Sequence, residues 1–67
     1  MKLLYTREQV EEIKNKIYLT DEEEKVFDMW LRDCSIIETS MKLNISPTTV
    51  TRRRTMIMKK IKLIKNV

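Results

Sequence analysis

Apolar residues return at every third or fourth position along most of the chain, which is the spacing that places them on one face of an α-helix. No stretch shows the strict alternation of apolar and polar residues that is typical of a β-strand. The fold class predicted from this pattern is all-α, a small helical bundle of about four helices. The predicted helices are 7–18, a second one that begins after Thr20, 36–43 and 47–65.

A serine or threonine stands immediately before each predicted helix, where its side chain can cap the first turn. Three of these caps are followed three residues later by Glu or Gln, the capping-box pattern in which each side chain bonds the backbone of the other residue. Leu3, Leu4 and Tyr5 precede the first cap and are predicted to form a hydrophobic staple. The capping-box pairs are Thr6–Gln9, Thr20–Glu23 and Ser35–Glu38.

The last two helices are separated by only three residues, "NIS". Asn44 tolerates the left-handed conformation that ends a helix, and Ser46 followed by Pro47 marks the start of the next one. A turn this short suits the steep crossing of a helix-turn-helix. Helix 36–43 is therefore predicted to be the supporting helix, and helix 47–65 the recognition helix.

On a helical wheel the recognition helix has one apolar side and one polar side. The apolar line, predicted to be buried, consists of Val50, Ile57, Ile61 and Ile64. The opposite side holds hydroxyls and cations and no acid: Thr48, Thr51, Arg52, Thr55, Lys59 and Lys62. These side chains suit the major groove of DNA, because Arg can bond guanine at two atoms, Thr can bond bases or contact a thymine methyl, and Lys can hold a phosphate.

The three adjacent arginines are predicted to have different roles. Arg52 points along the exposed side and is the predicted base reader. Arg53 and Arg54 flank the buried line, so their stems are expected to pack at the core edge while their charged heads reach a phosphate or an acid. For Arg54 the expected acid is Glu23. The backbone amides at the start of the helix offer a further site for a phosphate. The predicted DNA-binding residues are Ser46, Thr48, Thr49, Thr51, Arg52, Arg53, Arg54, Thr55 and Lys59.

Charge is divided unevenly along the chain, although the net charge of all 67 residues is only +4. Residues 1–38 contain all ten acids and six bases, a net charge of −4, whereas residues 39–67 contain eight bases and no acid. Such asymmetry favours a polyanion as the partner of the second half, and the plainer alternative is a solvated basic tail.

Composition excludes several other classes of protein. A single cysteine and no histidine leave no disulfide within the chain and no expected zinc site, and no motif calls for a cofactor. No residue has the arrangement of a nucleophile with its base, so the chain is not expected to be an enzyme. No apolar run approaches the roughly 20 residues of a membrane span, and the expected location is the cytoplasm.

The segment from Leu19 to Ile61, about two-thirds of the chain, resembles a known family. The stretches "LTDEEEKVF" and "SIIETSMKLNISPTTVTRRRTMIMKKI" look like the DNA-binding domain of LuxR-type response regulators, and almost equally like region 4 of bacterial sigma factors. The resemblance implies that Thr49 approaches a DNA phosphate. It also implies that the exposed positions Thr51, Arg52 and Thr55 approach bases. The matching residues are Leu19, Thr20, Glu23, Val26, Ser35, Glu38, Leu43, Ile45, Ser46, Thr49, Val50, Arg54, Ile57 and Ile61.

Three positions depart from the family pattern, since Thr39 and Ser40 replace the usual Ile-Ala pair and Asn44 replaces a glycine. Residues 1–18 are predicted to be an additional N-terminal segment that forms the amphipathic helix 7–18. The predicted organisation is that helix followed by a helix-turn-helix DNA-binding domain in residues 19–67, together one compact domain.

The predicted function is sequence-specific binding of double-stranded DNA by a small transcription regulator of a bacterium or phage. The alternative is a module like sigma region 4 that binds RNA polymerase or another regulator and has little DNA contact. A homodimer is a further possibility, because one such unit reads only a few base pairs and specificity normally needs two half-sites. Met56 and Leu63, with Met58 or Val67, offer a partner surface. The favoured interpretation, however, is that Met56 and Leu63 pack under helix 7–18.

Overall fold

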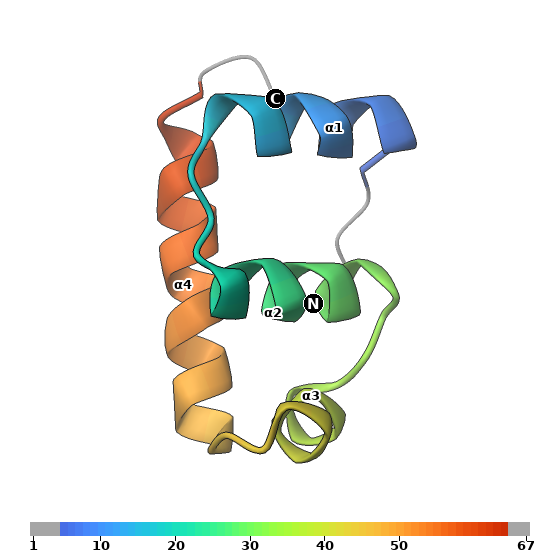
Figure 1. Cartoon of the computed structure of the whole chain (residues 1–67), viewed down its shortest axis with the longest axis vertical. Coiled ribbons are helices and arrows are strands. Elements are labelled where there is room, and N and C mark those ends of the chain that lie inside the picture. The colour runs from blue at the N-terminus through green and yellow to red at the C-terminus, as the bar shows by residue number, and fades with distance from the viewer. Residues whose placement is uncertain (1–4, 65–67) are drawn as a thin grey trace.

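The computed structural model describes residues 5–64, and this range contains four α-helices and no strand. They are α1 (Arg7–Lys16), α2 (Asp21–Leu31), α3 (Ile36–Leu43) and α4 (Pro47–Lys62). In Figure 1 the long helix α4 runs along one side of the molecule, with α3 near its beginning, α2 across its middle and α1 near its end. The prediction of an all-α bundle with a helix-turn-helix is confirmed, and the supporting helix has the predicted bounds.

All four helices begin at the predicted caps. Thr6 and Thr20 form complete capping boxes, in which the hydroxyl accepts from the amide three residues later and the Gln or Glu side chain accepts from the cap amide. Ser35 and Ser46 accept from the amides of Glu38 and Thr49, at 3.0 and 3.1 Å. At Ser35 the structure forms only this half of the predicted capping box within the described residues. Of the predicted staple, Tyr5 is partly buried against the core, and residues 3 and 4 lie outside the described range.

The core is made where α1, α2 and α4 meet. The predicted stripe of α4 is buried at Val50, Ile57 and Ile61, while Ile64 is partly buried. From α1 the buried side chain is Ile13, which is fully inaccessible to solvent. Each such buried aliphatic side chain contributes about 1.5 to 3 kcal/mol. The seven buried apolar residues are Ile13, Val26, Phe27, Trp30, Val50, Ile57 and Ile61.

Two helices end earlier than predicted. The N-terminal helix ends at Lys16 because the chain becomes extended at Ile17 (φ −123°, ψ 151°). Ile17 and Leu19 pack against the core while Tyr18 between them is exposed, and an alternation of this kind requires extended backbone. The recognition helix ends at Lys62, where the amides of the next two residues bond three positions back, at 3.2 and 2.9 Å, and tighten the last turn. Residue 65, the predicted end, lies outside the described range.

Both turns that precede α3 and α4 use a left-handed residue that is not glycine. Asn44 has φ 58° and ψ 43°, and the following amide of Ile45 bonds the Ser40 carbonyl at 3.1 Å. Asp33, which the sequence did not single out, has φ 66° and ends α2 in the same way, with the Cys34 amide on the Met29 carbonyl at 3.0 Å. These bonds satisfy carbonyls that the end of a helix would otherwise leave without partners.

The two departures from the family pattern in α3 fit the packed hairpin. Thr39 and Ser40 are buried, and buried hydroxyls need hydrogen-bond partners. Their hydroxyls donate to backbone carbonyls of the same segment, that of Thr39 to Ser35 at 2.8 Å and that of Ser40 to Ile37 at 2.7 Å. These hydroxyls therefore place no unsatisfied polar group between α3 and α4.

Candidate nucleic-acid interface

The outward side of α4 is the surface that the wheel predicted. Its six members are all exposed, and α4 contains no acidic residue. The hydroxyls of Thr51 and Thr55 donate to the carbonyls four residues earlier, at 3.2 and 3.0 Å, so their oxygens remain able to accept a bond from a base or from an arginine. The exposed residues are Thr48, Thr51, Arg52, Thr55, Lys59 and Lys62.

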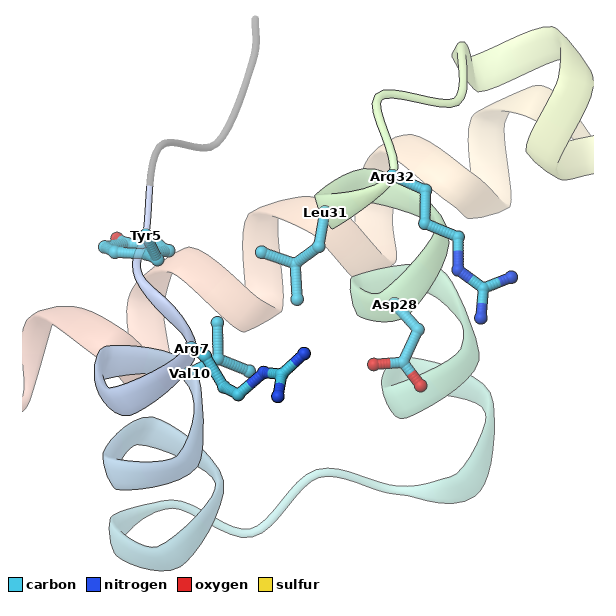
Figure 2. Close-up of a pocket in the computed structure, with 6 residues that line it drawn as sticks. All are labelled: Tyr5, Arg7, Val10, Asp28, Leu31 and Arg32. Atoms are coloured by element: carbon cyan, nitrogen blue, oxygen red, sulfur yellow. The ribbon is translucent and has the colours of Figure 1, made fainter.

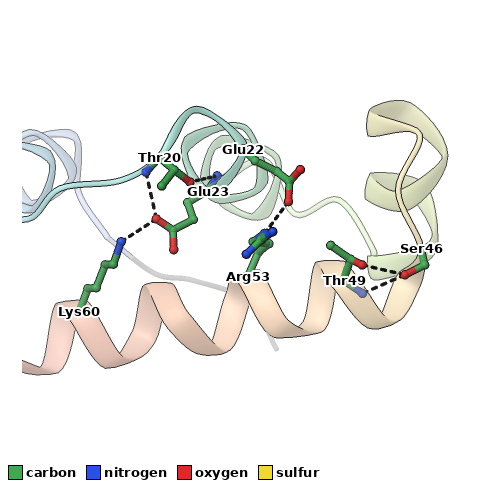
Figure 3. A network of polar contacts seen from close by, with 7 residues as sticks. All are labelled: Thr20, Glu22, Glu23, Ser46, Thr49, Arg53 and Lys60. Carbon is green, nitrogen blue, oxygen red and sulfur yellow. Dashed lines mark hydrogen bonds and ion pairs between the residues drawn. The ribbon is translucent and has the colours of Figure 1, made fainter.

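The start of α4 offers fewer backbone donors than the sequence suggested. The Thr49 amide is already bonded to the Ser46 hydroxyl, which also lies 2.8 Å from the Thr49 hydroxyl (Figure 3). Pro47 has no N–H, so the amide of Thr48 remains as the donor of this first turn that has no protein partner in the described range. A phosphate at this end of α4 would meet one amide and the exposed Ser46 hydroxyl, together with the dipole of the helix.

The three arginines have three different environments. Arg52 is exposed and extends from the outward side of α4. The Nε of Arg53 donates to a carboxylate oxygen of Glu22, in the first turn of α2 (Figure 3). Arg54 lies over the ring of Trp30, 4.6 Å from its centroid, and donates to the Cys34 carbonyl at 2.9 Å.

Arg54 therefore belongs to the packing of the domain. Its Nε is buried with no partner among the described residues, and burial lowers the pKa of its guanidinium from the usual value. The predicted ion pair between Arg54 and Glu23 is wrong. Glu23 faces a later turn of α4 and receives Lys60 instead, because Arg54 is turned toward the end of α2.

Glu23 and Lys60 form the most buried ion pair of the described residues. The carboxylate of Glu23 is 4% exposed, and one of its oxygens accepts from Lys60 at 2.6 Å and from the Thr20 amide at 2.9 Å (Figure 3). Lys60 also donates to the Tyr18 carbonyl at 2.8 Å. Burial raises the pKa of Glu23, but the bonds and charge of Lys60 and the bonds at Thr20 outweigh it, so the pKa lies below its ordinary value. This network fixes the first turn of α2 and the loop before it against α4.

The exposed apolar residues of α4 contradict the favoured sequence interpretation. Met56 is 45% exposed and Leu63 is 82% exposed, so neither is buried under α1. Met58, by contrast, packs against the core, and residue 67 lies outside the described range. Leu63 lies instead beside the exposed Tyr18 in a shallow depression of about 380 Å³, which Ile17 and Ile64 also line.

A second, open groove of about 590 Å³ lies between α1 and the end of α2 (Figure 2). Tyr5, Val10 and Leu31 give it apolar walls, and three charged side chains, Arg7, Asp28 and Arg32, also line it. These ends of α1 and α2 are the ones far from α4 in Figure 1, so the groove is separate from the outward side of α4.

The described residues show neither a metal site nor a membrane segment. Between residues 5 and 64, no three His, Cys, Asp or Glu side chains gather in a way that could hold a metal ion. None of the four helices in that range is both long enough and apolar enough to cross a membrane.

Sequence reasoning missed two residues that shape this interface, Glu22 and Lys60. Their partners Arg53 and Glu23 are 31 and 37 positions away, so no local spacing connects them. The helical wheel did give one indication that Arg53 and Lys60 face the same neighbouring helix. Arg53 and Lys60 lie within about 20° of each other on the wheel of α4, on the flank that faces α2.

Among families of known proteins, residues 18–67 match the GerE family, described as bacterial regulatory proteins of the luxR family. No match was found among curated proteins or among solved structures. Since the match covers more than half of the chain, the chain belongs to the luxR family of bacterial regulatory proteins. It is a helix-turn-helix DNA-binding domain of the kind that regulates transcription.

Proposed function

We propose that this protein binds double-stranded DNA in a sequence-specific way, as a small transcription regulator of a bacterium or phage. In this proposal α4 enters the major groove with its outward side toward the bases. The observation that carries the proposal is an acid-free surface of hydroxyls and cations on the helix that follows the helix-turn-helix turn. Arg52 stands in its middle and reads a base, because its guanidinium is exposed and can bond guanine at two atoms.

The neighbouring side chains have supporting roles in this proposal. Thr48, Thr51 and Thr55 contact base edges or thymine methyls, and Lys59 holds a phosphate of the backbone. Ser46 and the Thr48 amide receive a phosphate at the start of α4. Thr49 contributes through its hydroxyl, which already shares a short contact with Ser46.

Selection of binding sites from random duplexes, followed by gel shifts at several salt concentrations, tests this proposal. We expect a preferred site, and a log–log slope of affinity against salt near −0.9 for each phosphate contacted. Arg52→Ala should weaken binding to that site by about 5- to 150-fold and relax the preference at one base pair. Arg32→Ala is the matched control, since Arg32 is an exposed arginine at the far end of α2. Equal losses for the two variants, or selection without any preferred site, would refute sequence-specific reading by Arg52.

A second candidate function is supported by the exposed apolar surface at the end of α4. Tyr18 and Leu63 are 78% and 82% exposed and line one depression, which suits a protein partner. That partner is a second copy of the chain, which would supply the other half-site, or RNA polymerase or another regulator. Sedimentation of the free protein and of Leu63→Ser separates these cases. A dimer that Leu63→Ser dissociates supports the homodimer, and a monomer in both samples removes it.

A further inference from the structure

The pair formed by Glu22 and Arg53 lies at the edge of the proposed DNA-binding surface. On the wheel of α4, Arg53 follows Arg52 by 100° and is about 40° from Thr49. Figure 3 shows Arg53 rising from α4 between Thr49 and Lys60, with its charged head directed at Glu22 of α2. A phosphate that contacts Thr49 would therefore be within reach of the same arginine.

This ion pair is open to competition. The side chains of Arg53 and Glu22 are 41% and 39% exposed, so solvent and ligands reach both. The contact uses Nε and one carboxylate oxygen, whereas a guanidinium carries five N–H donors. Two oxygens of a phosphate, like those of a carboxylate, can accept two parallel N–H bonds from a guanidinium, so a phosphate can bind the same edge of Arg53. Glu22 consequently occupies the donor that a phosphate would use, and its negative charge repels the phosphate.

The neighbouring pair of Glu23 and Lys60 cannot exchange in this way. The Glu23 carboxylate is buried and is also bonded to the Thr20 amide, so releasing Lys60 would strand a buried charge. Glu22 has no second bond among the described residues, and an exposed pair of this kind contributes only about 0.2 to 1 kcal/mol. Two adjacent acids of one helix turn thus differ. Glu23 holds Lys60 in a pair that cannot exchange, whereas Glu22 holds Arg53 in a pair that a ligand can replace.

We propose that Glu22 competes with DNA for Arg53: the ion pair of the free protein is replaced in the complex by a contact between Arg53 and a backbone phosphate, and Glu22 thereby lowers the affinity for DNA. This inference rests on the proposed DNA binding. It makes Glu22 a residue that sets affinity without touching DNA.

A double-mutant cycle with Glu22→Gln and Arg53→Gln tests the proposal, with affinity measured on the selected duplex at several salt concentrations. Glu22→Gln alone should raise the affinity about 1.4- to 5-fold, the range that corresponds to loss of an exposed pair. In the Arg53→Gln background, Glu22→Gln should change the affinity no more than the control variant Asp21→Asn does. Arg53→Gln alone should weaken binding and reduce the salt slope by about 0.9.

Asp21→Asn is the matched control, because Asp21 is an exposed acid of the same helix turn and forms no ion pair among the described residues. Circular dichroism confirms that each variant is folded. If Glu22→Gln raises the affinity equally in both backgrounds, or no more than Asp21→Asn, general repulsion explains it and the proposal fails. A lower or unchanged affinity of Glu22→Gln also overturns it. If neither wild type nor any variant binds duplex DNA, the proposed function itself fails.

Discussion

The buried pair of Glu23 and Lys60 gives the sharpest test of how α2 and α4 are held together. Lys60→Met keeps most of the apolar stem of the side chain and removes the ammonium group. The buried Glu23 carboxylate is then left with the Thr20 amide as its partner in the described part of the chain. We expect the free energy of unfolding at pH 7 to fall by about 2 to 3 kcal/mol.

Two limits set this magnitude. A hydrogen bond to a charged group contributes about 1.5 to 3 kcal/mol, which is the direct loss. The cost of burying a charged Glu23 without Lys60 has an upper limit, because the carboxylate can instead take up a proton. From an ordinary pKa of 4.5, protonating Glu23 at pH 7 costs about 3.4 kcal/mol. Glu23→Gln should cost less, about 1 kcal/mol, because the amide oxygen still accepts from Thr20 and Lys60 keeps the Tyr18 carbonyl.

The loss should also depend on pH. The pKa of Glu23 is lowered in the folded wild type, so its contribution is complete above pH 4.5 and disappears as the pH falls through the folded pKa. In Lys60→Met the burial of Glu23 is no longer offset, which raises the folded pKa and destabilises the variant most at neutral pH. The difference between wild type and Lys60→Met should therefore narrow between pH 7 and pH 4.

Urea unfolding at a series of pH values, followed by circular dichroism and by the fluorescence of the buried Trp30, measures this difference. The matched control is Lys59→Met, since Lys59 is the neighbouring exposed lysine and should change stability by less than about 0.5 kcal/mol. A loss in Lys60→Met no greater than in Glu23→Gln would refute the reasoning, as would a difference that does not change with pH.

Two further predictions concern how α1 and Arg54 contribute to the domain. Ile13→Ala should lower the free energy of unfolding by about 2 to 5 kcal/mol in the same urea assay, because Ile13 is fully buried; a loss below about 1 kcal/mol would show that α1 is dispensable to the core. Arg54→Ala should cost about 1 to 3 kcal/mol of stability through its contacts with Trp30 and the Cys34 carbonyl. The salt slope of DNA binding should stay unchanged in Arg54→Ala, and a decrease near 0.9 would mean that Arg54 holds a phosphate instead.

The parts of the fold that depend on neighbouring residues were predictable from the sequence. Every helix start was found because a cap and the amide it bonds are three residues apart. The buried line and the exposed side of α4 followed from the helical repeat alone, and so did the separation of Arg52 from its two neighbours. These features determine which side chains of α4 lie on its outward side.

The partners of the charged residues were not predictable, because they depend on how α2 is rotated and placed along α4. A different placement would have brought Arg54 to Glu23, as expected, whereas the observed one brings Lys60 there and leaves Arg54 at the end of α2. The early end of α1 was missed for a related reason. The helical spacing of Val10, Ile13 and Ile17 continues in the sequence, but the need to bury Leu19 as well draws the backbone into an extended path.

The left-handed turns at Asp33 and Asn44 have a consequence for the unfolded chain. Glycine would suit both positions, yet glycine loses more backbone entropy on folding than any other residue, and this sequence contains none. Exchanging glycine for another residue at a compatible position changes stability by about 0.4 to 1 kcal/mol through the unfolded state alone. A domain of this size buries only about 60% of its unfolded surface, so such amounts matter. With Asn and Asp in its turns, the folded chain has a small unfavourable conformational energy at each left-handed residue. In return, the unfolded chain has fewer conformations to lose as it folds.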